Sequence, residues 1–325
     1  MKNFKYLQPE NLRQASEMLG NDWEESLPYG GGTDMYSLMK HGIVQPEKVV
    51  NLKSIPGMNK IEANGGGLKI GALVALSQIA AHPVVKEKYA VLEQAVMESA
   101  SPQLRNMGTI GGNICQRPRC WYYRGDFDCL RKGGDLCYAV DGENKYHCII
   151  GGSPCFIVYP SDPAVALTAL DAKVAISDGK KARSVPISEF YILPEIDVER
   201  ENILKPDEIV TGVEIPEPAA GTRSAYVKFK ERDVWDFAVV STAVVLQMNG
   251  RQVKNGRVAY GGVAPVPWLE EKVSGRLRGF TVSENNIEML AAQALKEATP
   301  LEQNEYKLPL ARNILKQMLR DLTRV

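Results

Sequence analysis

The stretch SLPYGGGTDMYSLMKH, residues 26–41, decides the fold expected for the N-terminal part of this chain. A short apolar run ends directly in Gly30, Gly31 and Gly32, and a helical pattern over residues 35–41 follows at once. Strand, glycine turn and helix in this order are typical of a phosphate site, because glycines let successive backbone N–H groups converge on an anion. The spacing is neither G-x-G-x-x-G nor G-x4-G-K-[ST], so neither a Rossmann site nor a P-loop is indicated. A plain tight turn remains the alternative.

A second glycine turn, GTIGGN at residues 108–113, follows further along the chain. Ahead of it, KIGALV at residues 69–74 predicts a buried strand, and residues 84–100 predict an amphipathic helix. Two anion-accepting turns in one domain suit a ligand with a pyrophosphate better than one with a single phosphate. The sequence therefore predicts a bound dinucleotide.

All six cysteines lie between Cys115 and Cys155, directly after the second turn. The spacing Cys120-x8-Cys129-x7-Cys137-x17-Cys155 lacks the C-x2-C pairs of ordinary zinc sites and the tight cysteine run of bacterial ferredoxins. Four thiolates in a loop of this length could still bind one four-iron four-sulfur cluster. A disulfide framework is disfavoured because the chain opens with no secretory signal, whereas a structural zinc loop stays open.

Composition narrows the classes of function. With 325 residues, the chain exceeds the usual size of a single core, so two or three structural units are expected. Lys plus Arg and Asp plus Glu number 39 each, which gives no reason to expect a nucleic-acid or membrane partner. The three histidines are in no nucleophile or H-E-x-x-H arrangement, so any redox chemistry would belong to cofactors. A cytoplasmic location is expected.

Four motifs in order carry a resemblance to a known family: PYGGGTD (28–34), NMGTIGGN (106–113), PSDPAVALTALDA (160–172) and DEIVTGVEIP (207–216). Together they resemble the FAD-binding medium subunit of the xanthine dehydrogenase family of molybdenum hydroxylases. The cysteine insertion is similar to that of the cluster-bearing type, found in 4-hydroxybenzoyl-CoA reductase β subunits and in the FAD subunits of periplasmic-type aldehyde oxidoreductases.

The resemblance implies an α+β fold with two parts. Residues 1–218 would form a two-part α/β FAD-binding domain of the PCMH/vanillyl-alcohol-oxidase type, with the cysteine-rich insertion at about residues 115–155. Residues 219–325 would form a C-terminal domain of the CO dehydrogenase flavoprotein type, an antiparallel sheet plus helices. The residues themselves agree, since apolar segments at 224–229, 237–248 and 258–263 predict a meander and two helical patterns, 284–297 and 308–322, follow.

Site residues are implied by the same resemblance. Asp162 corresponds to an FAD-binding aspartate, Lys228 to a lysine near the flavin, and Ile209 and Val210 to apolar residues packed on the isoalloxazine. From the residues alone, Asp162 would be a helix N-cap and Lys228 a solvated strand charge. The remaining implied FAD contacts are Leu27, Pro28, Tyr29, Gly30, Gly31, Gly32, Thr33 and Asp34 in the first turn, and Thr109, Gly111, Gly112 and Asn113 in the second.

For the cluster, the resemblance implies Cys120, Cys129, Cys137 and Cys155 as ligands. Cys115 and Cys148 are left over and are expected to be small packed side chains. Because Cys148 is also within reach of the loop, it could replace Cys155.

The resemblance implies an electron-transfer subunit of a heteromeric oxidoreductase, with substrate chemistry on a partner. The partners would be a large molybdopterin subunit and a small subunit with 2Fe-2S clusters, assembled as a dimer of heterotrimers, and an external electron carrier would exchange electrons through FAD. A ferredoxin-like potential would suit an aromatic acyl-CoA reductase. The alternatives are an aldehyde oxidoreductase or hydroxylase with outward electron flow and, in another class, a zinc-stabilised nucleotide-binding scaffold.

Overall fold

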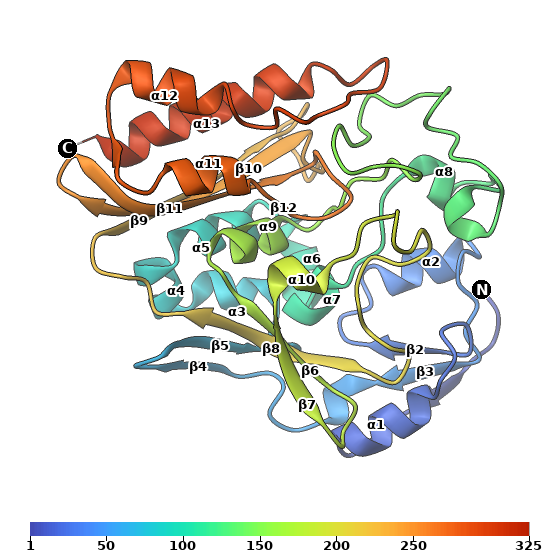
Figure 1. The fold of residues 1–325 in the computed structure, drawn as a ribbon. Coiled ribbons are helices and arrows are strands. Elements are labelled where there is room, and N and C mark those ends of the chain that lie inside the picture. The colour runs from blue at the N-terminus through green and yellow to red at the C-terminus, as the bar shows by residue number, and fades with distance from the viewer. Residues whose placement is uncertain (325) are drawn as a thin grey trace.

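The computed structural model describes residues 1–324, whose strands form three sheets (Figure 1). The first sheet is small and parallel, with the order β1-β3-β2, and Leu27 pairs with Val49 at its centre. Its elements are β1 (Lys5–Leu7), α1 (Leu12–Leu19), β2 (Ser26–Tyr29), α2 (Met35–Lys40), β3 (Lys48–Asn51) and the 3-10 helix η1 (Leu52–Ser54). The predicted strand, glycine turn and helix at residues 26–41 are confirmed.

The second sheet is antiparallel, with the order β4-β5-β8-β6-β7. Its strands are β4 (Ile61–Asn64), β5 (Gly67–Gly71), β6 (Lys173–Ser177), β7 (Ala182–Pro186) and β8 (Ile209–Pro216). A layer of short helices covers one face: α3 (Leu76–Ala81), α4 (Pro83–Lys88), α5 (Ala90–Met97), α6 (Pro102–Met107), α7 (Ile110–Ile114), α9 (Asp162–Ala169) and α10 (Ile187–Phe190) (Figure 1).

The single helix predicted over residues 84–100 is wrong. Two helices, α4 and α5, replace it, because Tyr89 leaves the helical conformation at φ −127° and ψ 48°. The Tyr89 ring is fully buried, and its hydroxyl donates to the Pro216 carbonyl at 3.2 Å. The break thus lets one large side chain join the helix layer to the end of β8.

The third sheet forms the C-terminal part, as the apolar segments predict. It has the order β12-β11-β10-β9, with β13 paired to β11. Its elements are β9 (Thr222–Phe229), β10 (Val240–Asn249), β11 (Gln252–Gly261), β12 (Trp268–Leu269), α11 (Glu271–Arg276), β13 (Phe280–Thr281), α12 (Glu284–Ala291) and α13 (Lys307–Thr323). Side chains alternate across β10: Ala243 faces the helix layer, whereas Val244 and Leu246 face the core beneath α12 and α13. The helix layer is therefore sandwiched between two antiparallel sheets (Figure 1).

The cysteine-rich segment, residues 115–155, lies beside the start of α13 and is mostly irregular (Figure 1). Its regular elements are α8 (Trp121–Arg124) and the 3-10 helix η2 (Leu130–Lys132). Lys307, which is fully buried, donates from Nζ to the carbonyls of Tyr146, His147 and Gly262 at 2.8, 2.9 and 2.7 Å. Side chains of the C-terminal part therefore hold the end of this segment in place.

Across residues 1–324, the helices are all too short or too polar to cross a membrane. The cytoplasmic location stays a prediction.

Candidate functional site

The two glycine turns meet at the centre of the N-terminal part. A Cβ on Gly31 would lie 1.9 Å from the Met107 carbonyl oxygen, so only glycine allows the first turn to lie against the segment that leads into the second. Within residues 1–324, the backbone N–H groups of Gly31, Gly32 and Thr33 donate to no other group. These N–H groups are therefore available to an anionic ligand.

The second turn differs from the expectation of a second anion-accepting turn. Ile110 N donates to the Val74 carbonyl at 3.0 Å and Gly111 N to the Ala72 carbonyl at 2.9 Å. Gly112 N donates to Thr109 Oγ1 at 3.2 Å, which caps the short helix α7. Because its N–H groups are already used, this turn offers a ligand small residues and side chains rather than free backbone donors.

A cavity of about 290 Å³, here called the first chamber, opens on one side of the turns. Its walls are mostly apolar and include Leu52, Leu73 and, at the start of β8, Ile209 and Val210. The predicted FAD contacts that line it are Leu27, Pro28, Gly30, Gly31, Gly32, Thr33, Asp34, Thr109, Gly111, Gly112, Ile209 and Val210. Tyr29 lies outside this lining, where its hydroxyl accepts a hydrogen bond from Lys53 Nζ at 3.1 Å.

A second chamber of about 380 Å³ lies on the other side of the turns. It shares Thr33, Asp34, Thr109, Gly112 and Gln116 with the first chamber and adds the predicted residues Asn113, Asp162 and Lys228. Two exposed aromatic residues that the sequence reasoning missed, Trp235 and Phe237, line its mouth. They belong to the loop before β10, which explains why that strand begins at Val240 rather than at the expected residue 237.

Asp162 and Lys228 form a buried ion pair in the wall of the second chamber. Their carboxylate oxygen and ammonium nitrogen are 2.9 Å apart, and the Lys228 side chain is only 1% exposed. Tyr226 donates its hydroxyl to Asp162 at 2.6 Å, and Lys228 also donates to the Glu98 carbonyl at 3.0 Å. Burial raises the pKa of Asp162, while the Lys228 charge and the Tyr226 hydrogen bond oppose that rise.

Both simpler interpretations of this pair are therefore wrong. Ser161, not Asp162, is the N-cap of α9, since its hydroxyl accepts from Ala164 N at 3.1 Å. Lys228 is buried rather than solvated.

The four predicted cluster ligands, Cys120, Cys129, Cys137 and Cys155, line one cavity. Aromatic and aliphatic side chains complete its wall: Tyr122, Tyr123, Leu130, Tyr138 and Ile157. Across residues 1–324, no group of three or more His, Cys, Asp or Glu side chains is arranged so that it could hold a metal ion.

Two buried side-chain nitrogen atoms lie close to sulfur atoms in this cavity. His147 Nε2 lies 3.2 Å from Cys120 Sγ, and Arg131 Nε lies 3.5 Å from Cys155 Sγ. A hydrogen bond from Cys137 and the charge of Arg131 lower the pKa of Cys155 to about 6 despite its burial. The Arg131 guanidinium therefore lies where its charge favours the thiolate form of Cys155.

The two leftover cysteines lie elsewhere. Cys148 is fully buried outside the lining of the cysteine cavity, and Cys115 lines the first chamber. Burial raises the pKa of both thiols, that of Cys115 to about 12. Their surroundings are those of packed side chains.

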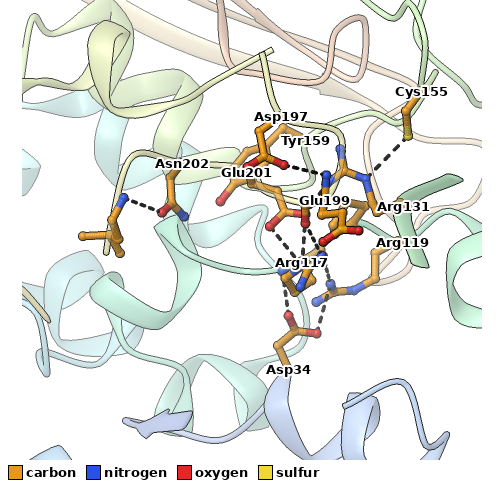
Figure 2. Close-up of polar contacts among 12 residues, drawn as sticks. Asp34, Arg117, Arg119, Arg131, Cys155, Tyr159, Asp197, Glu199, Glu201 and Asn202 are labelled. Carbon is orange, nitrogen blue, oxygen red and sulfur yellow. Dashed lines mark hydrogen bonds and ion pairs between the residues drawn. The ribbon is translucent and has the colours of Figure 1, made fainter. Parts of the chain in front are cut away.

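A chain of charged residues joins the first glycine turn to the cysteine cavity (Figure 2). Asp34 accepts from the backbone N–H of Arg117 at 2.8 Å, and Arg117 Nε lies 2.9 Å from a Glu201 carboxylate oxygen. Glu201 also pairs with Arg131 at 2.6 Å, and Arg131 reaches Cys155. Sequence reasoning missed Arg117, Glu201 and Arg131; the position of Arg131 between Cys129 and Cys137 was the one local signal.

Comparison with known families and proteins identifies the family of the chain. Residues 2–218 match the family described as the FAD binding domain in molybdopterin dehydrogenase. The chain is 37% identical over 294 residues to the aldehyde oxidoreductase FAD-binding subunit PaoB of Escherichia coli (strain K12), covering 89% of each chain. This chain belongs to the FAD-binding medium subunits of the molybdenum hydroxylase family.

The FAD-binding subunit has more distant relatives along its whole length. Residues 224–322 match the CO dehydrogenase flavoprotein C-terminal domain. The carbon monoxide dehydrogenase medium chain of Hydrogenophaga pseudoflava is 26% identical over 320 residues, or 97% of this chain and 96% of that one. The solved structure of quinoline 2-oxidoreductase from Pseudomonas putida 86 matches 99% of this chain and 98% of its own with a TM-score of 0.76 at 21% identity, which shows the same fold.

Proposed function

We propose that this oxidoreductase subunit holds FAD and one four-iron four-sulfur cluster and passes electrons between an external carrier and a molybdenum-containing partner. The observation that supports the cluster most directly is that Cys120, Cys129, Cys137 and Cys155 line a single cavity. A chain of hydrogen bonds and ion pairs from Asp34 through Arg117 and Glu201 to Arg131 connects this cavity to the first glycine turn, which supports treating them as parts of one site.

The two chambers fit a dinucleotide whose pyrophosphate crosses at the first glycine turn, where the N–H groups of Gly31, Gly32 and Thr33 are free. The adenine would occupy the apolar first chamber beside Ile209 and Val210. The isoalloxazine would occupy the second chamber, whose polar groups suit its polar edge. This assignment revises the expectation that Ile209 and Val210 pack on the isoalloxazine, because they lie in a different chamber from Asp162 and Lys228.

Bound FAD supplies the ability to exchange electrons singly or in pairs. The chain's own residues bind and orient it. Lys228 has three N–H donors and uses two of them within the protein, on Asp162 and on the Glu98 carbonyl, so one remains for the ligand. Asn113 accepts the Ser161 hydroxyl on Oδ1 at 2.6 Å, which directs its amide N–H groups elsewhere in the chamber.

A four-iron cluster is proposed rather than a single zinc ion because, among residues 1–324, no three His, Cys, Asp or Glu side chains are close enough together to hold one metal ion. Around one zinc the four sulfurs would lie roughly 3.8 Å apart, because each is about 2.3 Å from the metal. In a four-iron cluster each thiolate binds a different iron, so the sulfurs surround a larger space, and cysteine thiolates are its usual ligands. Cys155, which lines the cavity, is the fourth ligand in this proposal rather than Cys148, which does not.

The names of the relatives indicate which partner subunits this chain would have. The relatives' names describe an FAD-binding subunit of an aldehyde oxidoreductase and a medium chain of carbon monoxide dehydrogenase. We therefore propose a large molybdopterin subunit, a small 2Fe-2S subunit and a dimer of heterotrimers. The 37% identity to the aldehyde oxidoreductase subunit favours outward electron flow from substrate over an aromatic acyl-CoA reductase.

Metal and flavin analysis of anaerobically purified protein tests the proposal. We expect about four irons and one FAD per chain. Cys129→Ser and Cys137→Ser should lose iron, whereas Cys115→Ser should retain it as the matched control. Zinc in place of iron, or equal iron loss in all three variants, would contradict the ligand assignment, while absence of flavin would contradict the FAD site.

A further inference from the structure

We propose that the buried pair Arg131 and Glu201 sets the reduction potential of the cluster, Arg131 raising it and Glu201 moderating that effect. The inference rests on the proposed cluster and assigns roles to two residues that do not bind it. Both are positioning residues, since they act through Cys155 and through their charge.

Arg131 is placed to act on the cluster by its position in the loop. It belongs to η2, between Cys129 and Cys137, and lines the cysteine cavity. It is only 3% exposed, and its Nε lies 3.5 Å from Cys155 Sγ. A guanidinium is always charged, so its position brings a full positive charge and an N–H donor to one ligand sulfur.

Glu201 is the counterion that keeps this charge buried. It is 5% exposed and lies between Arg131, at 2.6 Å, and Arg117, at 2.9 Å (Figure 2). The two guanidinium groups and one carboxylate together carry a net charge of about +1. Removing the charge of Arg131 would bring the group to about zero, and removing that of Glu201 would bring it to about +2.

The sign of each effect follows from the charge of the cluster. Reduction adds one negative charge, so a nearby positive charge stabilises the reduced form more than the oxidised form and raises the potential. Low solvent exposure keeps this interaction strong, and hydrogen bonds to cluster sulfurs act in the same direction. Arg131 is nearer to the sulfur than Glu201 is, so its charge dominates over that of its counterion.

The test is a redox titration of the purified complex with dithionite. The electron paramagnetic resonance signal of the reduced cluster is measured at each potential. Arg131→Gln should shift the midpoint potential to more negative values and Glu201→Gln to more positive values. Arg131→Lys keeps the charge and should shift it less than Arg131→Gln. Arg320→Gln removes an arginine that pairs with Glu284 on the far C-terminal helices, and it should leave the potential unchanged.

Opposite shifts distinguish an electrostatic role from a merely structural one, which would move both variants the same way. Shifts of the same sign, or none, in variants that keep their iron would overturn the proposal. So would loss of iron from all three variants at these two residues, because the pair would then only hold the loop. If Arg131→Gln alone loses iron, the midpoint potentials of Glu201→Gln and Arg131→Lys decide whether the proposal holds. Absence of iron from the unmodified protein would instead overturn the proposed function.

Discussion

The C-terminal sheet and the cysteine-rich segment are held in shape by different interactions. In the sheet, β9, β10 and β11 form continuous antiparallel ladders, so backbone hydrogen bonds set the register whatever the surface side chains are. In residues 115–155 regular structure is confined to α8 and η2, and the carbonyls of Tyr146 and His147 near its end accept hydrogen bonds from a buried side chain far along the chain. The segment that surrounds the cysteine cavity therefore depends more on single side chains than the sheet does.

Lys307→Met should give the largest effect, because it removes the hydrogen bonds that the buried ammonium group donates to the end of the cysteine-rich segment. The variant leaves the carbonyls of Tyr146 and Gly262 without their donor. The His147 carbonyl loses one of two donors and keeps Asn304 Nδ2. Buried carbonyls without partners cost about 1–3 kcal/mol each, so we expect a loss of about 4 kcal/mol in the free energy of unfolding, together with loss of iron. Urea unfolding and iron analysis measure both.

Lys316→Met is the matched control on the same helix. Lys316 is partly exposed and pairs with Glu288 near the surface, so its replacement should change the free energy of unfolding by about 0.5 kcal/mol or less. Equal stability of the two variants would show that Lys307 does not hold the segment.

The same contrast explains which features could be predicted from the sequence. Local patterns predicted the strand, glycine turn and helix at residues 26–41 and the C-terminal meander, since these depend on neighbours in the chain. Where an element ends because of a distant contact, prediction fails: a helix over residues 84–100 looks continuous until Tyr89 is seen to reach Pro216.

The site follows the same rule. The glycine turns and the clustered cysteines are local features, and they were found. Glu201 is 70 residues from Arg131, and no short-range pattern marks their pairing. Asp162 likewise appears as a helix cap until Lys228 is brought beside it by the third sheet. Long-range ion pairs are thus what the sequence alone could not provide.

Leu246→Ala should break the sheet's core without touching the cysteine-rich segment. Leu246 is fully buried beneath α13, so its truncation leaves a cavity and should lower the free energy of unfolding by about 3 kcal/mol. Iron and flavin contents should stay at the unmodified level in the folded protein. Iron loss that parallels the loss of stability would show that the two regions are not independent.

Asn304→Ala tests the second attachment of the segment. Asn304 Nδ2 lies 3.2 Å from the His147 carbonyl and 3.1 Å from the Cys148 carbonyl, and Oδ1 accepts from Leu301 N. The free energy of unfolding should fall by about 2 kcal/mol. This is less than for Lys307→Met, because the hydrogen bonds that Asn304 makes are between neutral groups. Gln317→Ala, at an exposed position on α13, is the control, and an equal effect of both would argue against the attachment.

Trp23 and Arg200, here called the rim of the first chamber, should give the smallest effect, because both are only partly buried in its lining. The Arg200 guanidinium carbon lies 3.3 Å from the centre of the Trp23 ring, and both residues line the chamber. They come from loops 177 residues apart, so this rim, like the cysteine-rich segment, depends on a side-chain contact. A cation–π pair at a partly exposed site contributes about 1 kcal/mol, which corresponds to about a fivefold change in a dissociation constant.

We expect Trp23→Ala and Arg200→Ala each to weaken FAD binding about fivefold, measured by flavin fluorescence during titration of the deflavinated protein. The double variant should be little worse than either single variant, since each removes the same contact. Full additivity of the two losses would show that the residues act on FAD separately. The rim would then not depend on the contact between the two side chains, unlike the cysteine-rich segment.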